Sequence, residues 1–321
     1  MQTSADALGT PRPTSSACLA NLALATKCCR GVGIGLVDQA GARGAGQARR
    51  AGQGSGGLPG PLRYAVVALA VGLYVALGFI LRPGTNWYLL MGIPITLLFQ
   101  VLVARRPLRE LWLRNASFRR ADRWTVAWLA VCLVGPALTV VEGLRAGDWS
   151  VTVYGFLALG GAGGAAMCLR RLTPAQLRQL GLVLGAAVLV GVARVALNLA
   201  LHSGTDATPP ERLWAGLRSF LFYLAAVFIV EEVFFRGALD SYLHRTERGR
   251  GWASAVFVSL LWGVWHLPIT PSLSAAVVVQ LLVFQLAVGV ALSWLWRQSG
   301  NLALPGGTHA ILDGVRNALL A

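Results

Sequence analysis

The sequence predicts an all-α membrane protein, a polytopic bundle of about eight or nine membrane-spanning helices. The chain of 321 residues is 55% hydrophobic and only 13% charged, and its mean hydropathy is +0.61. Roughly a quarter of the residues of a soluble domain are charged, so this composition indicates an integral membrane protein. In addition, apolar runs of about 20 residues, the length needed to cross a bilayer, recur from Tyr64 onward.

Residues 1–62 differ in composition from the rest of the chain. The stretch GARGAGQARRAGQGSGGLPGP is rich in Gly, Ala and Arg and has no aromatic residue. Such a segment cannot bury enough apolar surface to offset its chain entropy, so we expect a disordered tail. Whether this tail is a native segment, a transit sequence or the product of a start codon placed too early stays open. Residues 63–321 are expected to form the membrane domain.

Nine apolar runs divide the membrane domain. They lie at 64–81, 86–104, 124–143, 151–168, 180–201, 214–243, 252–268, 274–296 and 302–320. The fourth run contains GGAGGAA, whose small residues predict close contact with a neighbouring helix. A phosphate-binding loop is not expected there, because no predicted strand precedes it.

The charge of the chain is strongly basic, with 28 Lys and Arg residues against 13 Asp and Glu residues. The arginines cluster in alternate short segments between the apolar runs, a pattern that sets the orientation of a membrane protein. We therefore expect a lipid bilayer as the surroundings, a cytoplasmic N-terminus and no nucleic-acid partner. Lys27 is the only lysine, and this preference for arginine is typical of a high-GC bacterial genome, so the expected location is a bacterial plasma membrane.

An acidic pair and an arginine interrupt the sixth run, in the stretch VFIVEEVFFRGALD at 227–240. Ionisable groups at such a depth cost about 3 kcal/mol or more unless they are paired or hydrated, so they mark a candidate functional site. Glu232 and Arg236 are four residues apart and can pair on one helix face. Glu231 projects about 100° away and can face a different cavity.

Two histidines lie in later runs. WGVWH ends at His266, and HAILD places His309 and Asp313 on one helical face. If the sixth run is one continuous helix, then Glu231, His266 and His309 lie roughly 21, 24 and 18 Å from the nearest loop arginines, at 1.5 Å per residue. Each feature alone also fits a structural role, such as an ionic clasp or a hydrogen bond between helices. Their similar depth predicts a shared cavity.

Together, EEVFFRG, WGVWH and HAILD resemble the three motifs of the CAAX prenyl protease and bacteriocin-processing (CPBP, or Abi) intramembrane endopeptidases. Those motifs read EExxxR, FxxxH and Hxxx(N/D). The resemblance covers about residues 210–321, which would be the catalytic core. Trp262 stands where the family usually has Phe, and Asp313 stands where Asn is common in the prenyl proteases.

The resemblance implies hydrolysis of a peptide bond in a membrane-associated peptide or protein substrate. Glu231 would activate water as a general base, and His266 would orient or deprotonate that water. His309, steadied by Asp313, would stabilise the oxyanion. Arg236 would keep Glu232 ionised. A zinc ion held by Glu231, His266 and His309 is one alternative, and a metal-independent, glutamate-dependent protease is the other.

Two other function classes fit the same residues. A transporter or proton relay also uses ionisable groups inside a membrane, but many transporters are built from paired halves, and no repeat of the three motifs is found in the first half of the chain. A non-catalytic scaffold or immunity-type protein would carry the same motifs.

Overall fold

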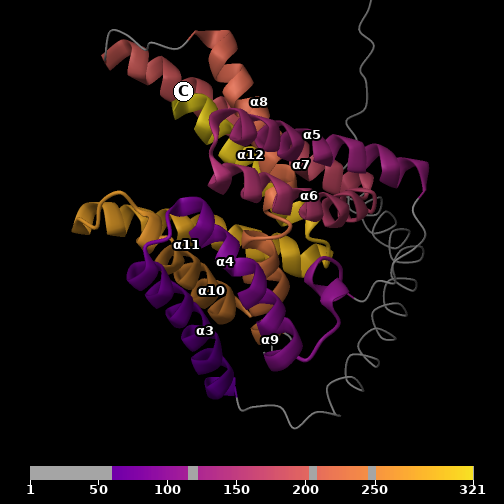
Figure 1. Ribbon diagram of the computed structural model, residues 1–321, viewed down its shortest axis with the longest axis vertical. Helices are drawn as coiled ribbons and strands as arrows, with labels where there is room; N and C mark the ends of the chain where they lie inside the picture. The colour runs from indigo at the N-terminus through magenta and orange to yellow at the C-terminus, as the bar shows by residue number, and fades with distance from the viewer. Residues whose placement is uncertain (1–59, 115–121, 202–207, 245–250, 321) are drawn as a thin grey trace, which may run out of the picture. The chain divides into compact units, whose positions relative to one another are not determined.

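The computed structural model describes residues 60–114, 122–201, 208–244 and 251–320 (Figure 1). The predicted tail at 1–62 lies almost entirely outside the described residues. The first described helix begins at Gly60, slightly before the expected boundary.

Within the described ranges the chain is helical, and the structure has no β-strand there beyond one isolated bridge between Leu113 and Asn301. In chain order the elements are α3 (Gly60–Leu81), α4 (Thr85–Leu98), η1 (Phe99–Val103), η2 (Leu108–Leu111), α5 (Arg123–Ala146), α6 (Trp149–Leu169), α7 (Pro174–Leu201), α8 (Pro209–Ala226), η3 (Val233–Asp240), α9 (Ser241–His244), α10 (Trp252–Trp265), η4 (Leu267–Ile269), α11 (Ala275–Ser299) and α12 (Ala303–Leu320). The all-α prediction is confirmed.

Six helical segments in the described part of the chain are long and apolar enough to cross a membrane. They are Gly60–Leu81, Thr85–Val103, Arg123–Ala146, Trp149–Leu169, Trp252–Ile269 and Ala275–Ser299. Helices α7, α8 and α12 are not among them, so the expected count of eight or nine spans is not confirmed. Three charged residues in α8, namely Glu211, Arg212 and Arg218, lower its apolar character.

The helix ends follow ordinary capping chemistry. Asp122 accepts a hydrogen bond from the backbone N–H of Thr125 at the start of α5, and Thr208 forms a capping box with Glu211 at the start of α8. These side chains satisfy backbone N–H groups that have no partner within the helix. At the other end of α5, Gly147 takes a left-handed conformation (φ 69°), which glycine adopts without a steric penalty.

The helices of the described domain form two groups (Figure 1). Helices α5, α6, α7, α8 and α12 pack on one another in the first group, and α3, α4, α9, α10 and α11 form the second. Contacts of α11 with α12 and of α4 with α6 join the groups, and η3 contacts α4, α10 and α11. The segment with the acidic pair follows α8 and therefore connects one group to the other.

Glycines allow the first group to pack closely. A Cβ atom on Gly161 of α6 would lie 2.3 Å from the carbonyl oxygen of Ala225 in α8, and one on Gly135 of α5 would lie 2.2 Å from the backbone nitrogen of Phe222. Real Cβ atoms do not approach so closely, so only glycine fits at these contacts. The close helix contact predicted from GGAGGAA is confirmed.

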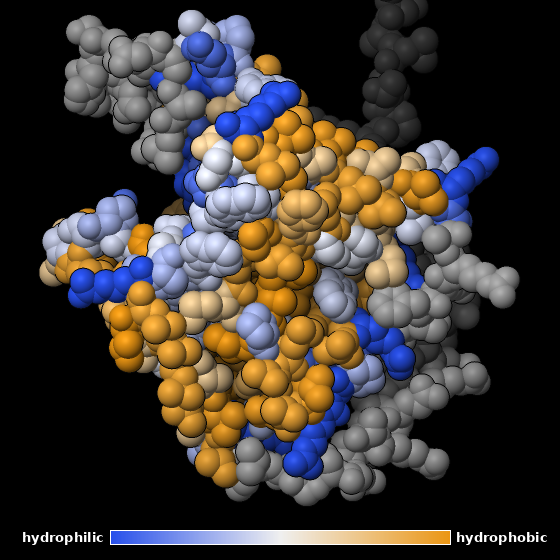
Figure 2. Space-filling model, in the orientation of Figure 1, coloured by the Kyte–Doolittle hydropathy of each residue, from blue (hydrophilic) through white to orange (hydrophobic). Residues whose placement is uncertain are grey.

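The outer surface of the membrane helices is apolar. Leu69 and Ile80 of α3 and Val283 and Phe284 of α11 are each more than half exposed. Figure 2 shows hydrophobic side chains over much of the visible face. Exposed apolar surface of this extent is expected where lipid, rather than water, surrounds the helices. The chain is an integral membrane protein.

Candidate active site

The acidic pair lies at a break between helices. Helix α8 ends at Ala226, a buried turn covers residues 227–230, and the π-helix η3 begins at Val233. The sixth apolar run is therefore not one continuous α-helix, which corrects the expectation, and the depth of roughly 21 Å for Glu231 does not apply. A π-helix has a wider turn than an α-helix and is frequently found at functional sites.

Glu232 and Arg236 form the innermost part of the site. Their side chains are 0% exposed, and Arg236 Nε lies 3.6 Å from Glu232 Oε2. Arg236 Nη2 also donates a hydrogen bond to the carbonyl of Gly289 in α11 (3.3 Å), and the guanidinium lies over the ring of Trp262 in α10 at 4.8 Å from its centroid. This arginine therefore links η3, α10 and α11.

His266 caps the C-terminal end of α10. Its Nδ1 lies 2.8 Å from the carbonyl oxygen of Trp262, one turn earlier. Because a carbonyl oxygen only accepts hydrogen bonds, Nδ1 carries the proton in the neutral ring and Nε2 is left as an acceptor. The end of α10 is held in place by Tyr88 of α4, whose hydroxyl donates to the carbonyl of Trp265 (2.7 Å).

His309 lies within α12 between carboxylates on both sides of its ring. Its Nδ1 is 2.9 Å from Oε1 of Glu232, and its Nε2 is 3.3 Å from Oδ2 of Asp313. A carboxylate oxygen accepts, so the Nδ1–H donates to Glu232. Asp313 is one turn after His309, as the sequence spacing predicts for neighbours on one face. Two carboxylates from different segments thus determine the orientation of this ring.

Glu231 is the point where the three segments meet. Its Oε2 lies 3.8 Å from Nε2 of His266 and 3.9 Å from Nε2 of His309. The same oxygen accepts a hydrogen bond from the indole N–H of Trp262 (3.0 Å). The structure therefore brings all six predicted site residues into one cluster, in which an acceptor nitrogen and a carboxylate face each other.

The exposure of the cluster increases from its inner to its outer end. The side chains of Glu232 and Arg236 are fully buried, those of Glu231 and Asp313 are each 9% exposed, and that of His266 is 18% exposed. Water can therefore contact Glu231 and His266, whereas the ion pair behind them is closed off.

Three residues at the cluster have contacts that sequence reasoning missed. Trp262 was placed in a motif by its aromatic ring alone, whereas its indole N–H donates to Glu231. Gln285 of α11 is buried, and its Nε2 lies 3.3 Å from both ring nitrogens of His266. Arg316 Nη1 lies 2.9 Å from Oδ1 of Asp313. An amide inside an otherwise apolar run and an arginine three residues after the aspartate were the available signals.

A zinc site in a protein needs at least three side chains whose ligating atoms surround one point. Among the residues that the structure describes, no group of three His, Cys, Asp or Glu side chains is arranged so that it could hold a metal ion. Glu231 Oε2 already accepts a hydrogen bond from Trp262. Both ring nitrogens of His309 face carboxylates. The residues do not fit a zinc ion in this arrangement, and zinc stays a prediction.

The fold and the cluster define a class of protein: a helical membrane protein with a buried glutamate–histidine centre. Residues 213–315 match the family model described as type II CAAX prenyl endopeptidase Rce1-like. This match contains all three motifs and confirms the family resemblance over this part of the chain. The family supports a protease-type membrane enzyme. Neither the curated proteins nor the solved structures include a significant match to the chain.

Proposed function

We propose that the protein is an intramembrane endopeptidase that hydrolyses a peptide bond with water activated by Glu231. The observation that carries this proposal is the meeting of two imidazole nitrogens, His266 Nε2 and His309 Nε2, within 3.9 Å of one oxygen of Glu231. A carboxylate and a neutral imidazole with an acceptor nitrogen are the groups that general-base catalysis requires.

In the proposed reaction, Glu231 removes a proton from water while Nε2 of His266 accepts a hydrogen bond from the same water. The hydroxide attacks the carbonyl carbon of the substrate, and the carbonyl oxygen becomes an oxyanion. In this scheme His309 is an imidazolium whose two N–H groups donate to Glu232 and Asp313, and its positive charge stabilises the oxyanion. The proton on Glu231 then passes to the leaving amine as the C–N bond breaks.

The remaining polar residues position these groups. Asp313 and Glu232 hold the ring of His309 from its two sides. Trp262 holds Glu231 by a hydrogen bond to Oε2 and holds His266 through its backbone carbonyl. Preorganised groups of this kind lower the barrier because they do not need to reorient during the reaction.

We also propose the orientation and the surroundings of the enzyme. The arginine-rich segments before α3, between α4 and α5, and after α6 lie on the cytoplasmic side of a bacterial plasma membrane. The substrate is a membrane-associated peptide or protein. No nucleic-acid partner is proposed.

The test is Glu231→Gln, which retains the size of the side chain but removes the base. Peptide termini in the membrane proteome are compared by mass spectrometry between cells with the wild-type protein and cells with the variant. We expect cleavage to fall about 100-fold or more, with unchanged protein abundance. Asp122→Asn, a matched carboxylate-to-amide change at the start of α5, should leave cleavage intact. Full cleavage in Glu231→Gln would refute the proposal.

Removal of metal tests the cofactor separately. The purified protein is dialysed against a chelator, and its metal content is measured together with cleavage. Retained cleavage without stoichiometric metal supports the glutamate-dependent reaction. Loss of cleavage together with one metal ion per chain, and recovery on adding zinc, would require the cluster to rearrange into a metal site. Unchanged termini with and without the protein would instead favour a scaffold or a transporter.

A further inference from the structure

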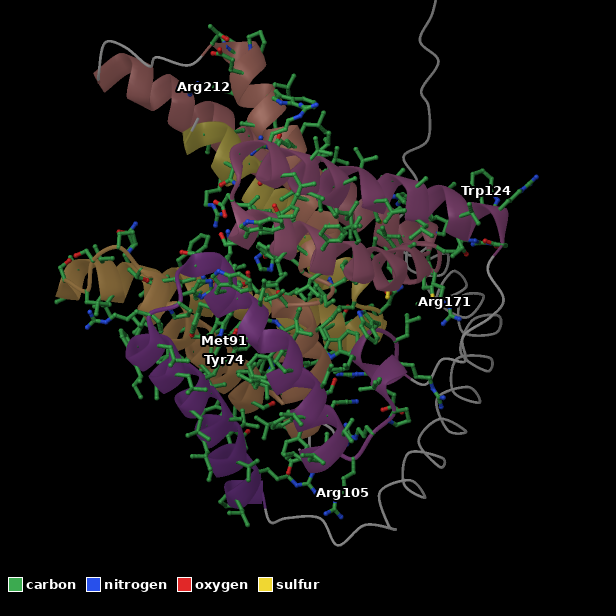
Figure 3. The ribbon with its side chains drawn as sticks, in the orientation of Figure 1. Tyr74, Met91, Arg105, Trp124, Arg171 and Arg212 are labelled. Carbon is green, nitrogen blue, oxygen red and sulfur yellow. The ribbon has the colours of Figure 1, made fainter. Side chains whose placement is uncertain are left out.

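The helices of the described domain end at two faces. We call the face that contains the ends of η1 and α6 and the start of α5 the arginine-rich face. The face where α8 and α11 begin and where α10 and α12 end is the opposite face. Figure 3 shows Arg105, Trp124 and Arg171 toward the first face and Arg212 at the other end. The question is from which face a substrate reaches Glu231.

On the arginine-rich face, a segment at residues 108–113, which we call the plug, closes the way to the cluster. The indole N–H of Trp112 donates to the carbonyl of Phe228, 2.7 Å away, just before the acidic pair.

The plug also packs tightly against η3. Leu111 is fully buried, and a Cβ atom on Gly237 of η3 would lie only 2.4 Å from the carbonyl oxygen of Leu111. Leu113 pairs with Asn301, two residues before α12 begins. Packing at this density leaves no room for a peptide between the plug and η3, among the residues that the structure describes.

Toward the opposite face the cluster becomes progressively more exposed. Along α12, the side chain of Asp313 is 9% exposed, and that of Arg316, one turn later, is 53% exposed. His266, at the end of α10, is the most exposed of the six predicted site residues. Both helices run toward the opposite face at these positions.

A pocket of about 420 Å³, lined by both polar and apolar side chains, lies on the same side between the start of α4, α5, α6, α8 and the end of α12. Glu142 and Arg218 form an ion pair at its rim (2.8 Å), with both side chains almost half exposed. The amide of Asn317 donates to Ser219 at its wall (2.6 Å). The pocket therefore presents both hydrogen-bonding groups and charge at the surface of a membrane protein.

Helix α12 connects this pocket to the cluster. Asn317, which lines the pocket, is four residues after Asp313, so the two side chains lie on one face of α12. Arg316, beside Asn317, binds Asp313 (2.9 Å). The end of α12 thus borders the pocket and, one turn earlier, the cluster.

We propose that this pocket is the access route through which an extended peptide segment and water reach Glu231 from the opposite face. The inference rests on the proposed function and adds the direction from which the substrate approaches. The amide and hydroxyl groups of Asn317 and Ser219 suit the backbone of an extended peptide, and the aromatic walls suit its apolar side chains. With a cytoplasmic N-terminus, the substrate segment lies at the outer surface of the membrane.

The first test measures access without requiring activity. In a cysteine-free background, His266→Cys is treated with a membrane-impermeant methanethiosulfonate, added either to spheroplasts or to inverted vesicles. We expect modification only from the opposite face. Ala215→Trp, which fills the pocket, should slow it at least tenfold. Leu217→Trp, two residues along α8 at a surface position, should leave the rate unchanged. Modification from the arginine-rich face, or an unchanged rate in Ala215→Trp, would overturn the proposal.

The second test adds a bulky group to the pocket after the protein has folded. A failure to fold can therefore not be mistaken for a blocked pocket. Asn317→Cys is modified in the membrane, and cleavage of the native proteome is compared before and after modification. We expect at least a tenfold loss, whereas the same modification of Arg109→Cys in the plug should have no effect. Equal cleavage before and after modification of Asn317→Cys would refute the access route.

The two proposals fail in different ways. If Glu231→Gln abolishes cleavage but filling the pocket does not, the proposed enzymatic function is supported and the proposed access route is wrong. If no cleavage occurs in the wild type but modification of His266→Cys still depends on the pocket, the access route stands and the proposed chemistry is wrong.

Discussion

Glu231 and Glu232 are adjacent in the chain but lie in different surroundings. Glu232 is fully buried against Arg236 and accepts a hydrogen bond from His309. Glu231 is slightly exposed, accepts from Trp262 and faces the acceptor nitrogen of His266. Consecutive helical residues project about 100° apart, so one segment can supply both a closed ionic clamp and a reactive group. The comparison predicts that the first carboxylate serves chemistry and the second serves structure.

The largest expected effect on stability comes from the inner carboxylate. Glu232→Gln leaves the Arg236 guanidinium buried without its counter-charge, and breaking a buried pair in this way costs about 3–5 kcal/mol in the free energy of unfolding. Glu231→Gln removes no ion pair with an arginine, so it should cost about 1 kcal/mol or less. Denaturant titration of the purified protein in micelles measures both. Equal losses would mean that the two carboxylates have the same role.

A double variant sharpens this comparison. Glu232→Gln with Arg236→Met replaces both charges by neutral residues of similar length, a change that is often tolerated in buried pairs. We expect part of the lost stability to return, while cleavage stays low because His309 has lost the charge of Glu232. A double variant no more stable than the single one would show that the pair matters for packing rather than for charge.

The next effect concerns Arg316, which we assign as a positioning residue for Asp313. Arg316→Gln should lower cleavage about tenfold, equivalent to about 1.5 kcal/mol for one charge-assisted hydrogen bond. In an Asp313→Asn background the same change should have little effect, because a neutral amide needs no cation. The measurement is cleavage in all four members of this cycle. Additive losses would exclude the coupling.

A smaller effect is expected at Gln285. Gln285→Met retains the length of the side chain but removes the amide beside His266, so cleavage should fall about threefold to fivefold, equivalent to about 1 kcal/mol. Stability should be unchanged or higher, because the buried Oε1 of Gln285 has no hydrogen-bond partner among the described residues. Ser293→Ala, a buried position on the same helix, is the control and should not alter cleavage. Loss of stability without loss of cleavage would make Gln285 structural.

The smallest effect is expected at an exposed ion pair, which contrasts with the buried one. Asp122 binds Arg170 (2.7 Å) at the start of α5. The hydrogen bond from Arg170, together with those from Thr125, holds the pKa of Asp122 below its usual value. The resulting stability is complete above the ordinary pKa of about 3.9 and is lost as the pH falls through the lowered folded-state value. The melting temperatures of wild type and Asp122→Asn should therefore differ most above the ordinary pKa and converge as the pH falls below it, and salt should reduce the difference.

The sequence by itself determined the class of the protein and the local pairs within its candidate site. The apolar runs predicted a helical membrane protein, because a bilayer requires long hydrogen-bonded helices. Spacing of four residues predicted the Glu232–Arg236 and His309–Asp313 pairs, because residues on one helix face are neighbours whatever the rest of the chain does. These contacts are local and are readable from residue order alone.

Only the tertiary structure decided which groups meet across elements. The break after Ala226 and the π-helix η3 direct Glu231 toward α10, and no periodic pattern in the apolar run marks that break. The indole of Trp262, the amide of Gln285 and the plug at residues 108–113 acquire their contacts from helix packing. Packing between helices depends on side-chain volumes over the whole bundle, so residue spacing carries no record of it.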